Sequence, residues 1–409
     1  MTNAAVTGRA TRRRPADRRE RIVAAAGELF GRHGFHNVSM ADVASAVGIT
    51  ASALYRHFRN KQDLLLQVVT TVIDTIARRV ADATDLASYL RDTASGTLER
   101  RDAATLWQRE ARHLPEERRA ELRRALADIA DGIAALITRE RPGLARADAE
   151  LLAWAVLSVF GSVSGHRFAL PRRRFEALLR SLAGTAAGTA LGTAPGTAAE
   201  AAEVIEAAGD PPVRRTAAGL PPELAVSRRE RLLDEAVRLF DERGFQSVST
   251  DDIGQAADVT GPSLYRHFPS KNDLLVAAVV RAGEQRRART TTALAEATGP
   301  ADGLALLLRS YVGFASDHSH LIGMLIGEID QLPEKEQRAA RQAQRDYLAL
   351  WLHVLDQVRP GLDPAEAKIT VSAVLTVVDN AVRTGRARHR RDLGDRLAEI
   401  GTALLLPAS

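Results

Sequence analysis

An internal repeat constrains this chain more than any other feature. The pentapeptide LYRHF stands at Leu54–Phe58 and returns at Leu264–Phe268, an offset of 264 − 54 = 210 residues. The surrounding sequence matches at the same offset, without a gap, from residue 18 to residue 65. Farther along, LPE at residue 114 recurs at residue 332, and RPGL at residue 141 recurs at residue 359. Both offsets are 218 residues, since 332 − 114 = 218 and 359 − 141 = 218. Self-similarity over this distance indicates a duplicated domain, not a solenoid of short units.

Composition limits the classes to which the protein can belong. The 409 residues include no cysteine, which excludes disulfides and thiolate chemistry, and the 45% hydrophobic and 26% charged residues are typical of a soluble globular protein. The N-terminus lacks an apolar signal segment, and the longest strongly apolar run, near 151–163, is too short to span a membrane. We therefore expect a cytoplasmic protein with no membrane partner. The net charge of +5, with arginines crowded at the N-terminus, is a weak indication of a polyanionic partner.

The first part of each copy has the pattern of three helices. An apolar stripe at helical spacing predicts a helix over 17–33, which a glycine ends. Ser39 then caps a second helix over 40–47, a turn of about three residues follows, and a third helix runs over 51–57. Two short helices joined by such a turn are typical of a helix-turn-helix, whose second helix enters the major groove of DNA.

Polar side chains of this motif suit contact with DNA. Tyr55 and His57 alternate with the apolar Leu54 and Phe58, and Lys61 opens the next helix, so polar groups at fixed spacing would face a phosphate backbone. The alternative is that the whole pentapeptide packs a small core. The DNA-contacting residues that we predict in the first copy are Ser39, Thr50, Ala51, Ser52, Ala53, Tyr55, Arg56, His57 and Lys61, together with Arg12, Arg13 and Arg14 of the N-terminal arm. Those in the second copy are Ser249, Thr250, Thr260, Gly261, Pro262, Ser263, Tyr265, Arg266, His267 and Lys271.

The run GF–––S––D[VI]A––[AV]G[IV]T–––LYRHF––K–DLL, read over both copies, resembles the DNA-binding domain of TetR-type transcriptional repressors. The segments RRRPADRRERI and LWQREARHLPEERR are similar to those of mycobacterial tandem repressors of mammalian-cell-entry (lipid import) operons. The resemblance implies an all-α fold in which two TetR-like protomers share one chain. Each protomer would have a helix-turn-helix domain followed by a helical ligand and dimerisation domain, and the two would pack as an intramolecular pseudo-dimer. In the second copy Asp258 replaces the turn glycine Gly48, a change that aspartate tolerates better than most residues.

The segment between the copies is rich in glycine, threonine, alanine and proline, which indicates a flexible linker. We expect a basic arm at 1–16, DNA-binding domains at 17–64 and 226–274, helical regulatory domains at 65–183 and 275–409, and a linker at 184–225.

A small-molecule effector of unknown identity is a second expected partner, alongside double-stranded operator DNA. The candidate effector-binding residues are Trp107, Arg109, Glu110 and Trp154 in the first copy and Tyr347, Trp351, Asp379 and Asn380 in the second. Each tryptophan could equally fill the core, and Arg109 with Glu110 could be a surface or interhelix ion pair.

Other functions have little support in the sequence. No catalytic constellation, phosphate-binding glycine loop or metal-ligand spacing is present, so we expect no enzyme activity, no cofactor and no metal. The favoured function is a ligand-released repressor that acts as a monomer and reads an asymmetric operator with its two unlike helix-turn-helix units. The alternative is a helical scaffold or adaptor protein with vestigial helix-turn-helix units.

Overall fold

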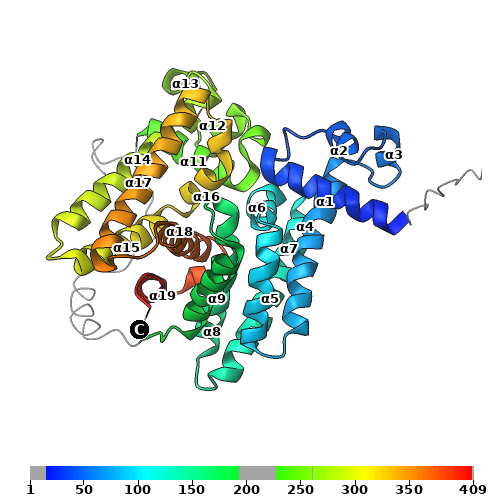
Figure 1. Cartoon of the computed structure of the whole chain (residues 1–409). Helices are drawn as coiled ribbons and strands as arrows, with labels where there is room; N and C mark the ends of the chain where they lie inside the picture. The colour runs from blue at the N-terminus through cyan, green and yellow to red at the C-terminus, as the bar shows by residue number, and fades with distance from the viewer. Residues whose placement is uncertain (1–14, 193–226, 260, 408–409) are drawn as a thin grey trace, which may run out of the picture. The chain divides into compact units, whose positions relative to one another are not determined.

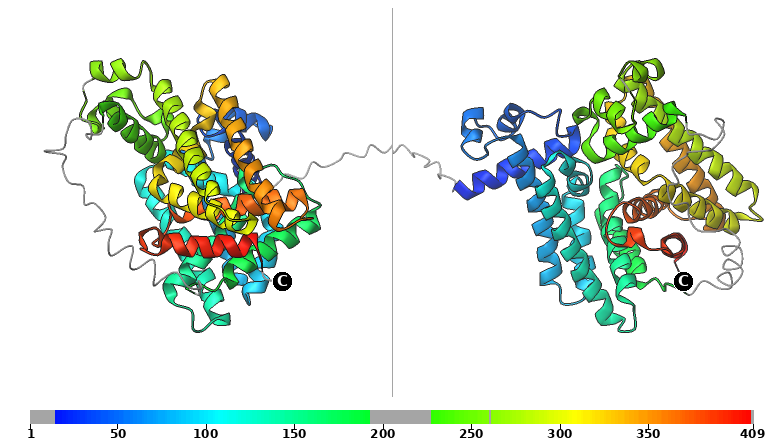
Figure 2. Two further views of the ribbon diagram at one scale, coloured as in Figure 1. Left: turned by 90° about the vertical axis from the view of Figure 1, so that its left-hand side faces the viewer. Right: turned by 180° about the vertical axis from the view of Figure 1, so that it is seen from behind.

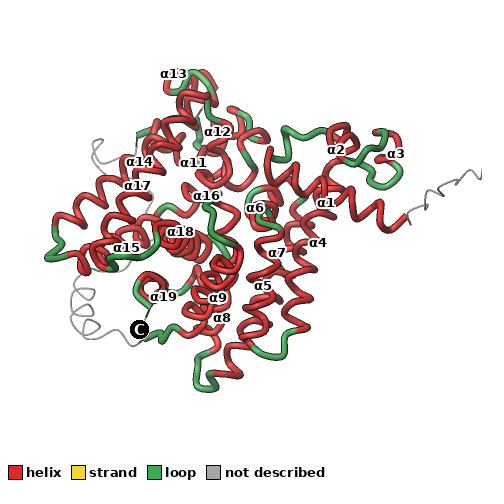
Figure 3. The backbone as a smooth tube through the Cα atoms, viewed as in Figure 1, coloured by secondary structure: helices red, strands yellow, loops and turns green. Residues whose placement is uncertain are grey.

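The computed structural model describes residues 15–192, 227–259 and 261–407, and within these ranges every regular element is a helix (Figure 3). The all-α prediction is therefore confirmed. The predicted arm residues Arg12, Arg13 and Arg14, most of the predicted linker, and Thr260 lie outside the described residues.

The two copies repeat the same order of helices (Figure 1). The first copy contains α1 (Pro15–His33), α2 (Met40–Ala46), α3 (Ala51–Tyr55), α4 (Lys61–Asp82), α5 (Leu86–Glu99), α6 (Ala103–Gln108), the 3₁₀ helix η1 (Glu110–His113), α7 (Glu116–Glu140), α8 (Arg146–Gly161), η2 (Ser162–Gly165) and α9 (Arg172–Gly188). The second contains α11 (Arg228–Arg243), η3 (Phe245–Ser247), α12 (Thr250–Ala256), α13 (Gly261–His267), α14 (Lys271–Ala295), α15 (Pro300–Asp317), α16 (Ser319–Glu328), η4 (Ile329–Gln331), α17 (Glu334–Val358), α18 (Pro364–Ala381), η5 (Ala387–His389) and α19 (Leu393–Leu405).

The described chain divides into two compact units that do not follow the predicted domain boundaries. The first unit runs up to Thr75 and also includes Asp102–Arg123, while the second contains Ile76–Arg101 and everything from Arg124 onwards. The predicted boundary at residue 64 falls inside the continuous helix α4. Residues 102–123, predicted as part of a regulatory domain, belong instead with the first DNA-binding helices, because they make the contacts with the end of α1 that are described below.

The predicted second DNA-binding segment lies in the same unit as most of the helices predicted to be regulatory. This unit is also where the two copies meet: α8 and α9 of the first copy pack against α18 and α19 of the second (Figures 1 and 2). In that interface the Asn380 amide Nδ2 donates a hydrogen bond of 3.1 Å to Ser158 Oγ, and both residues are buried.

Helix α9 continues beyond the predicted start of the linker at residue 184. It ends at Gly188, and Ala183, Ala186 and Ala187 on it are buried. Small side chains pack closely here, and the Arg141 guanidinium donates to the carbonyl of Ala187 at 2.7 Å. The linker was predicted to begin too early because alanine suits both a tightly packed helix and a flexible segment.

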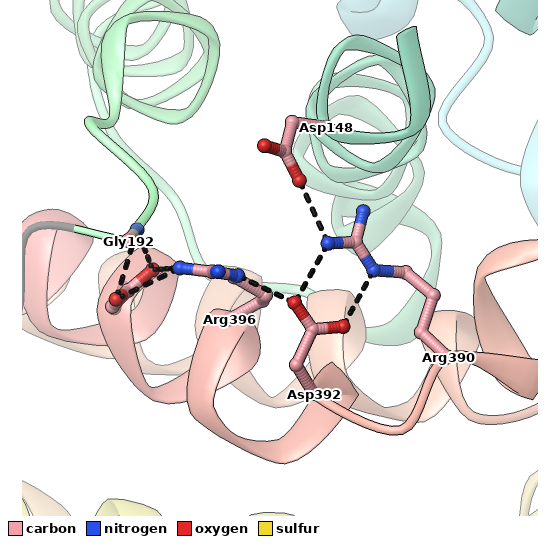
Figure 4. Close-up of polar contacts among 6 residues, drawn as sticks. Asp148, Gly192, Arg390, Asp392 and Arg396 are labelled. Atoms are coloured by element: carbon pink, nitrogen blue, oxygen red, sulfur yellow. Dashed lines mark hydrogen bonds and ion pairs between the residues drawn. The ribbon is translucent and has the colours of Figure 1, made fainter. Parts of the chain in front are cut away.

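Ion pairs border the contact between the copies (Figure 4). Arg390 Nη2 bridges Asp148 of the first copy, at 2.7 Å, and Asp392 of the second, at 2.9 Å. Arg396 Nε adds a contact of 2.8 Å to the same Asp392 carboxylate, whose pKa these hydrogen bonds hold well below its usual range. The arrangement neutralises two aspartates that would otherwise repel each other across the interface.

The segment Arg146–Gly165, which includes α8, is long and apolar enough to cross a membrane by length and composition alone, so the expectation that the apolar run here is too short for a span is wrong. Its helix is instead covered on several sides by α9 and α18, and 67% of the apolar window is buried within the protein. A helix without a polar face is what a contact between two helical layers requires.

Candidate nucleic-acid interface

Each predicted helix-turn-helix is present, and its turn contains a residue with left-handed backbone. Gly48 has φ 70° in the first copy, and Asp258 has φ 55° in the second. Asp258 is the one non-glycine residue with positive φ in the described chain. The expectation that aspartate preserves the turn is confirmed.

The repeated pentapeptide divides into buried and exposed side chains in the same way in both copies. Leu54 and Leu264 are 0% exposed, whereas Tyr55 and Tyr265 are 53% and 51% exposed. Because large aromatic side chains are usually buried, two exposed tyrosines at equivalent places indicate a surface that contacts another molecule. The alternative in which all five residues pack a core does not hold for the tyrosines. Arg56, Arg266 and His267 are also exposed, and His57 is half-buried.

Ser39 and Ser249, which we predicted to contact DNA, are the N-terminal caps of α2 and α12. Ser39 Oγ accepts from the N–H of Asp42 at 3.1 Å and donates to the Asp42 carboxylate at 2.7 Å, and Ser249 repeats this capping box with Asp252. These hydrogen bonds lower the pKa of Asp42. The serines therefore fix the helix start, and their hydroxyls would reach a phosphate only if the capping box rearranged.

The predicted base-reading residues differ in accessibility. In the first copy Thr50 and Ser52 are exposed, Ala51 and Ala53 are half-buried, and Thr50 Oγ1 caps α3 by accepting from the N–H of Ala53 at 3.2 Å. Ser263, the counterpart of Ala53, is only 7% exposed, so the prediction that its side chain reads a base conflicts with its burial in this structure. Gly261 and Pro262 begin α13, and Thr250 Oγ1 lies 3.0 Å from Tyr265 Oη.

Lys61 and Lys271 have a role that the sequence did not indicate. The Lys61 ammonium donates to the carbonyls of Phe35 at 2.7 Å and Val38 at 2.9 Å, and it lies 4.3 Å from the centre of the Phe35 ring. Lys271 makes the matching contacts with Phe245 and Val248. Two of the three ammonium protons are thus used to hold the loop between the first two helices. Only the third ammonium proton remains to donate a hydrogen bond to a phosphate.

A buried glutamate fixes the same loop from the other side. Glu110 is 2% exposed, and its Oε2 accepts from the N–H of Phe35 at 2.8 Å. Glu328 is equally buried, and its Oε1 accepts from the N–H of Phe245 at 3.1 Å. The two glutamates are 328 − 110 = 218 residues apart, so the contact is part of the repeat. We call this contact the glutamate anchor.

The residues beside the glutamate anchor differ between the copies. In the first, the His113 ring stacks on Phe35 with centroids 5.2 Å apart and meets the His36 ring edge-on at 4.4 Å. In the second, the equivalent residues are glutamines, and Gln246 Nε2 donates to Gln331 Oε1 at 2.6 Å. Burial lowers the pKa of His113 to about 3 and also lowers that of His36. The first copy thus has a titratable pair where the second has a neutral one.

This difference predicts a pH effect on stability. An unfolded histidine takes up a proton near pH 6.5, whereas folded His113 resists protonation down to about pH 3, so its contribution to stability is present above pH 6.5 and is lost as the pH falls toward 3. At pH 5 the loss should be about 2 kcal/mol. The double variant His36→Gln, His113→Gln gives the first copy the two glutamines of the second. The free energy of unfolding in urea should then fall less between pH 7 and pH 5 than it does in the parent. An equal loss of stability in variant and parent would contradict the assignment.

Most of the candidate effector residues of the first copy make contacts that do not form an effector site. Glu110 forms the glutamate anchor and pairs with Arg109 Nε, so neither a surface pair nor an effector contact describes it well. Trp154 packs at the contact between the copies, where a Cβ added to Gly385 would lie 2.8 Å from its Nε1. Trp107 is half-buried, and no contact assigns it a role.

In the second copy the structure brings three of the four candidates together. Tyr347 and Trp351 have ring centres 6.3 Å apart, and Asp379 accepts a hydrogen bond from the hydroxyl of Tyr311, whose ring also faces both. Asn380 belongs instead to the contact between the copies, through Ser158. Within the described residues there is no group of three or more histidine, aspartate or glutamate side chains that could hold a metal ion.

Comparison with known proteins identifies the class. The family described as "Bacterial regulatory proteins, tetR family" matches residues 22–68 and again residues 232–278. The chain is 25% identical over 159 residues to the HTH-type transcriptional regulator LmrA of Bacillus subtilis, which covers 38% of this chain and 84% of LmrA. It is 39% identical over 66 residues to the HTH-type transcriptional repressor KstR of Mycolicibacterium smegmatis, covering 16% of this chain and 32% of that protein.

A solved TetR-family regulator from Bordetella parapertussis is 20% identical and matches 45% of this chain and 96% of its own length, with a TM-score of 0.42. The family matches both predicted DNA-binding segments, so the chain carries two TetR-type DNA-binding domains in tandem.

Proposed function

We propose that one chain acts as a complete repressor, in which the two copies form an intramolecular pseudo-dimer that binds an asymmetric operator and is released by a small, lipid-like molecule. The observation that carries this proposal is the packing of α8 and α9 against α18 and α19. Oligomers of identical chains bury equivalent surfaces against each other. Here the two surfaces come from one chain.

The charges at this contact favour pairing of the second copy with the first over pairing of two second copies. Arg174 of the first copy lies 2.7 Å from Glu366 and 3.3 Å from Asp363 of the second. In the second copy the residue equivalent to Arg174 is Asp392, since 392 − 174 = 218. Two second copies paired in the same geometry would set Asp392 against Glu366, which repel. The charges therefore disfavour the pairing of two second copies.

The two DNA-binding segments share the residues that hold their helices in place, and they differ at the positions that would contact the bases. Leu54, Phe58 and Lys61 keep the same environments as their counterparts. At the start of the groove-entering helix, however, residues 51–53 read ASA and residues 261–263 read GPS. Direct contacts with base edges determine sequence preference, so unlike residues there support an operator with two unlike half-sites.

Substitution of the exposed tyrosines tests this function. Tyr55→Ala and Tyr265→Ala should each weaken binding to DNA from the gene's own upstream region by about tenfold, a loss of roughly 1.4 kcal/mol. Each should also remove protection of a different half-site in footprinting. Arg118→Ala, at an exposed i,i+3 ion pair on α7, serves as the control. If the double tyrosine variant bound DNA as tightly as the parent, the scaffold alternative with vestigial helix-turn-helix units would be favoured.

A further inference from the structure

Three charged or titratable side chains join the first helix of the second copy to two later helices, and we call them the Asp241 clamp. They are Asp241 in the last turn of α11, His320 in the first turn of α16, and Arg383, which follows α18. Asp241 Oδ2 lies 2.9 Å from His320 Nδ1, and Asp241 Oδ1 lies 3.0 Å from Arg383 Nη2. The Asp241 side chain is 13% exposed, so solvent screens these contacts less than it screens a surface pair.

A glycine makes room for the clamp. A Cβ added to Gly323 of α16 would overlap the Asp241 carboxylate and would lie 2.6 Å from Arg383 Nη2. Glycine inside a helix is less favourable than alanine by about 1 kcal/mol, so its presence here indicates that the space is needed. In the first copy the residue equivalent to Gly323, at an offset of 218, is Thr105. The space for the carboxylate is therefore a feature of the second copy.

The first copy cannot form the clamp. The residues equivalent to Asp241, His320 and Arg383 are Gly31, at an offset of 210, and Asp102 and Gly165, at an offset of 218. The two glycines have no side chain, and an acid replaces the histidine. Both copies keep the glutamate anchor, whereas only the second adds an ionic contact between its first helix and the helix that carries the anchor.

The surroundings of His320 favour its protonated form. The hydrogen bond to Asp241 raises the pKa of His320 above 6.5, and burial opposes this shift. The His320 side chain is 49% exposed, so protons from solvent reach the ring. The other charged or titratable groups around it and the adjoining His318 are Asp234, Arg238 and Glu242 of α11, Arg281 and Arg289 of α14, Asp317 at the end of α15, and Arg383.

We propose that His320 is a pH-responsive positioning residue for the second DNA-binding segment, which it holds against α16 through Asp241 when it is protonated and releases in part when it is neutral. Protonation turns a neutral hydrogen bond into a charge-assisted one, which is about twice as strong. Because α16 ends at Glu328, the same helix also holds the loop that follows α11.

The consequence for DNA rests on the proposed function. A segment that is already ordered loses less conformational freedom when it binds. The second segment should therefore bind its half-site more tightly when His320 is protonated.

The two copies should respond to acid in opposite senses. Protonation of His320 stabilises the folded protein, so its contribution is complete below about pH 6.5 and is lost as the pH rises through the higher folded pKa. The pKa of His113 in the first copy is lowered, so its contribution is lost as the pH falls below about 6.5. The clamp can therefore be measured between pH 6.5 and pH 8, where the contribution of His113 is constant.

Urea unfolding of the full-length protein at pH 6.5 and pH 8 tests the clamp without DNA. The parent should lose more stability over this range than His320→Gln, whose amide can still donate to Asp241 but does not titrate. Gly323→Ala displaces the Asp241 carboxylate without removing a titratable group, and it should reduce the pH dependence in the same way. His353→Gln, which removes an exposed histidine of α17 outside the clamp, should behave as the parent does.

DNA binding is measured at the same two pH values with a duplex that carries only the half-site protected by the second segment. The affinity of the parent should fall about threefold more between pH 6.5 and pH 8 than that of His320→Gln or Gly323→Ala. The duplex with the other half-site should show no difference between the parent and either variant.

Three results would overturn the proposal. They are an equal pH dependence of stability in the parent and His320→Gln, a parent-like pH dependence in Gly323→Ala, and a half-site affinity whose pH dependence neither variant changes. A protein that shows the expected unfolding results but binds neither duplex would refute the proposed function and leave the clamp itself supported.

Discussion

Replacing Glu110 by alanine should lower the free energy of unfolding by about 3 kcal/mol, one of the two largest single effects that we expect in this chain. The Glu110 carboxylate accepts the N–H of Phe35 inside the protein and pairs with Arg109. Without it, the buried backbone N–H of Phe35 loses its acceptor and the Arg109 guanidinium loses one of its partners. Glu110→Gln keeps an acceptor oxygen and should lose less than the alanine variant.

The same substitution should weaken DNA binding, because the loop that the glutamate anchor holds also carries the contacts of Lys61 with Phe35 and Val38. Glu328→Ala tests the equivalent anchor of the second copy. Urea unfolding and mobility-shift titrations measure the two effects, and Glu121→Ala, at an exposed i,i+3 pair, is the control. A loss of less than 1 kcal/mol for both alanine variants would show that the anchor does not hold the loop.

Replacing Trp154 by alanine should cost about 3–5 kcal/mol, as expected for loss of a large buried aromatic side chain. Trp154 is 6% exposed, and it packs against Gly385, whose φ of 74° suits glycine. Because the tryptophan belongs to the first copy and the glycine to the second, the cavity would open at the contact between them. The variant should unfold at lower urea concentration and lose affinity for the full operator more than for a single half-site.

Two further variants sharpen this prediction. Gly385→Ala should also destabilise, since an added Cβ would meet the indole and strain the backbone. Trp107→Ala removes a half-buried tryptophan away from the contact between the copies and should cost less. If Trp154→Ala and Trp107→Ala had the same effect on stability and on operator binding, the contact between the copies would not be what Trp154 stabilises.

Local sequence signals predicted the helices and the turn correctly. The Ser39 and Ser249 caps and the left-handed turn at Gly48 or Asp258 depend on residues close in the chain, and the structure has all of them. Because the sequence repeats, the helices predicted in the first copy could also be predicted in the second. The helix ends were less accurate: α2 and α3 stop at Ala46 and Tyr55, short of the predicted ends.

Contacts between distant residues could not be predicted in this way. Glu110 and Phe35 are 75 residues apart, and nothing near Glu110 in the sequence indicates that its carboxylate is buried. Lys61 was expected at the DNA because a lysine at a helix start suits a phosphate, whereas its ammonium bonds two carbonyls more than twenty residues earlier. One signal was overlooked: LPE recurs at the offset of 218, and the glutamate four residues before it recurs as well.

Of the eight candidate effector residues, the structure brings three together, all in the second copy. Asp379 stands out as a charged residue on the otherwise apolar helix α18, and Tyr347 and Trp351 stand out as aromatic residues in a chain with only 4% aromatic residues. Arg286 and Thr290, which contact Tyr347, could have been found by aligning the copies, because their counterparts Ile76 and Val80 are apolar.

The central claim is that one chain supplies both halves of a TetR-type dimer. Its most direct test is the mass of the free protein and of its complex with DNA. Light scattering of the free protein should give a single chain of 44.2 kDa, and the complex with operator DNA should contain one chain whose footprint covers two unlike half-sites. A free protein that is a stable dimer, and a complex that protects a perfect inverted repeat, would contradict it.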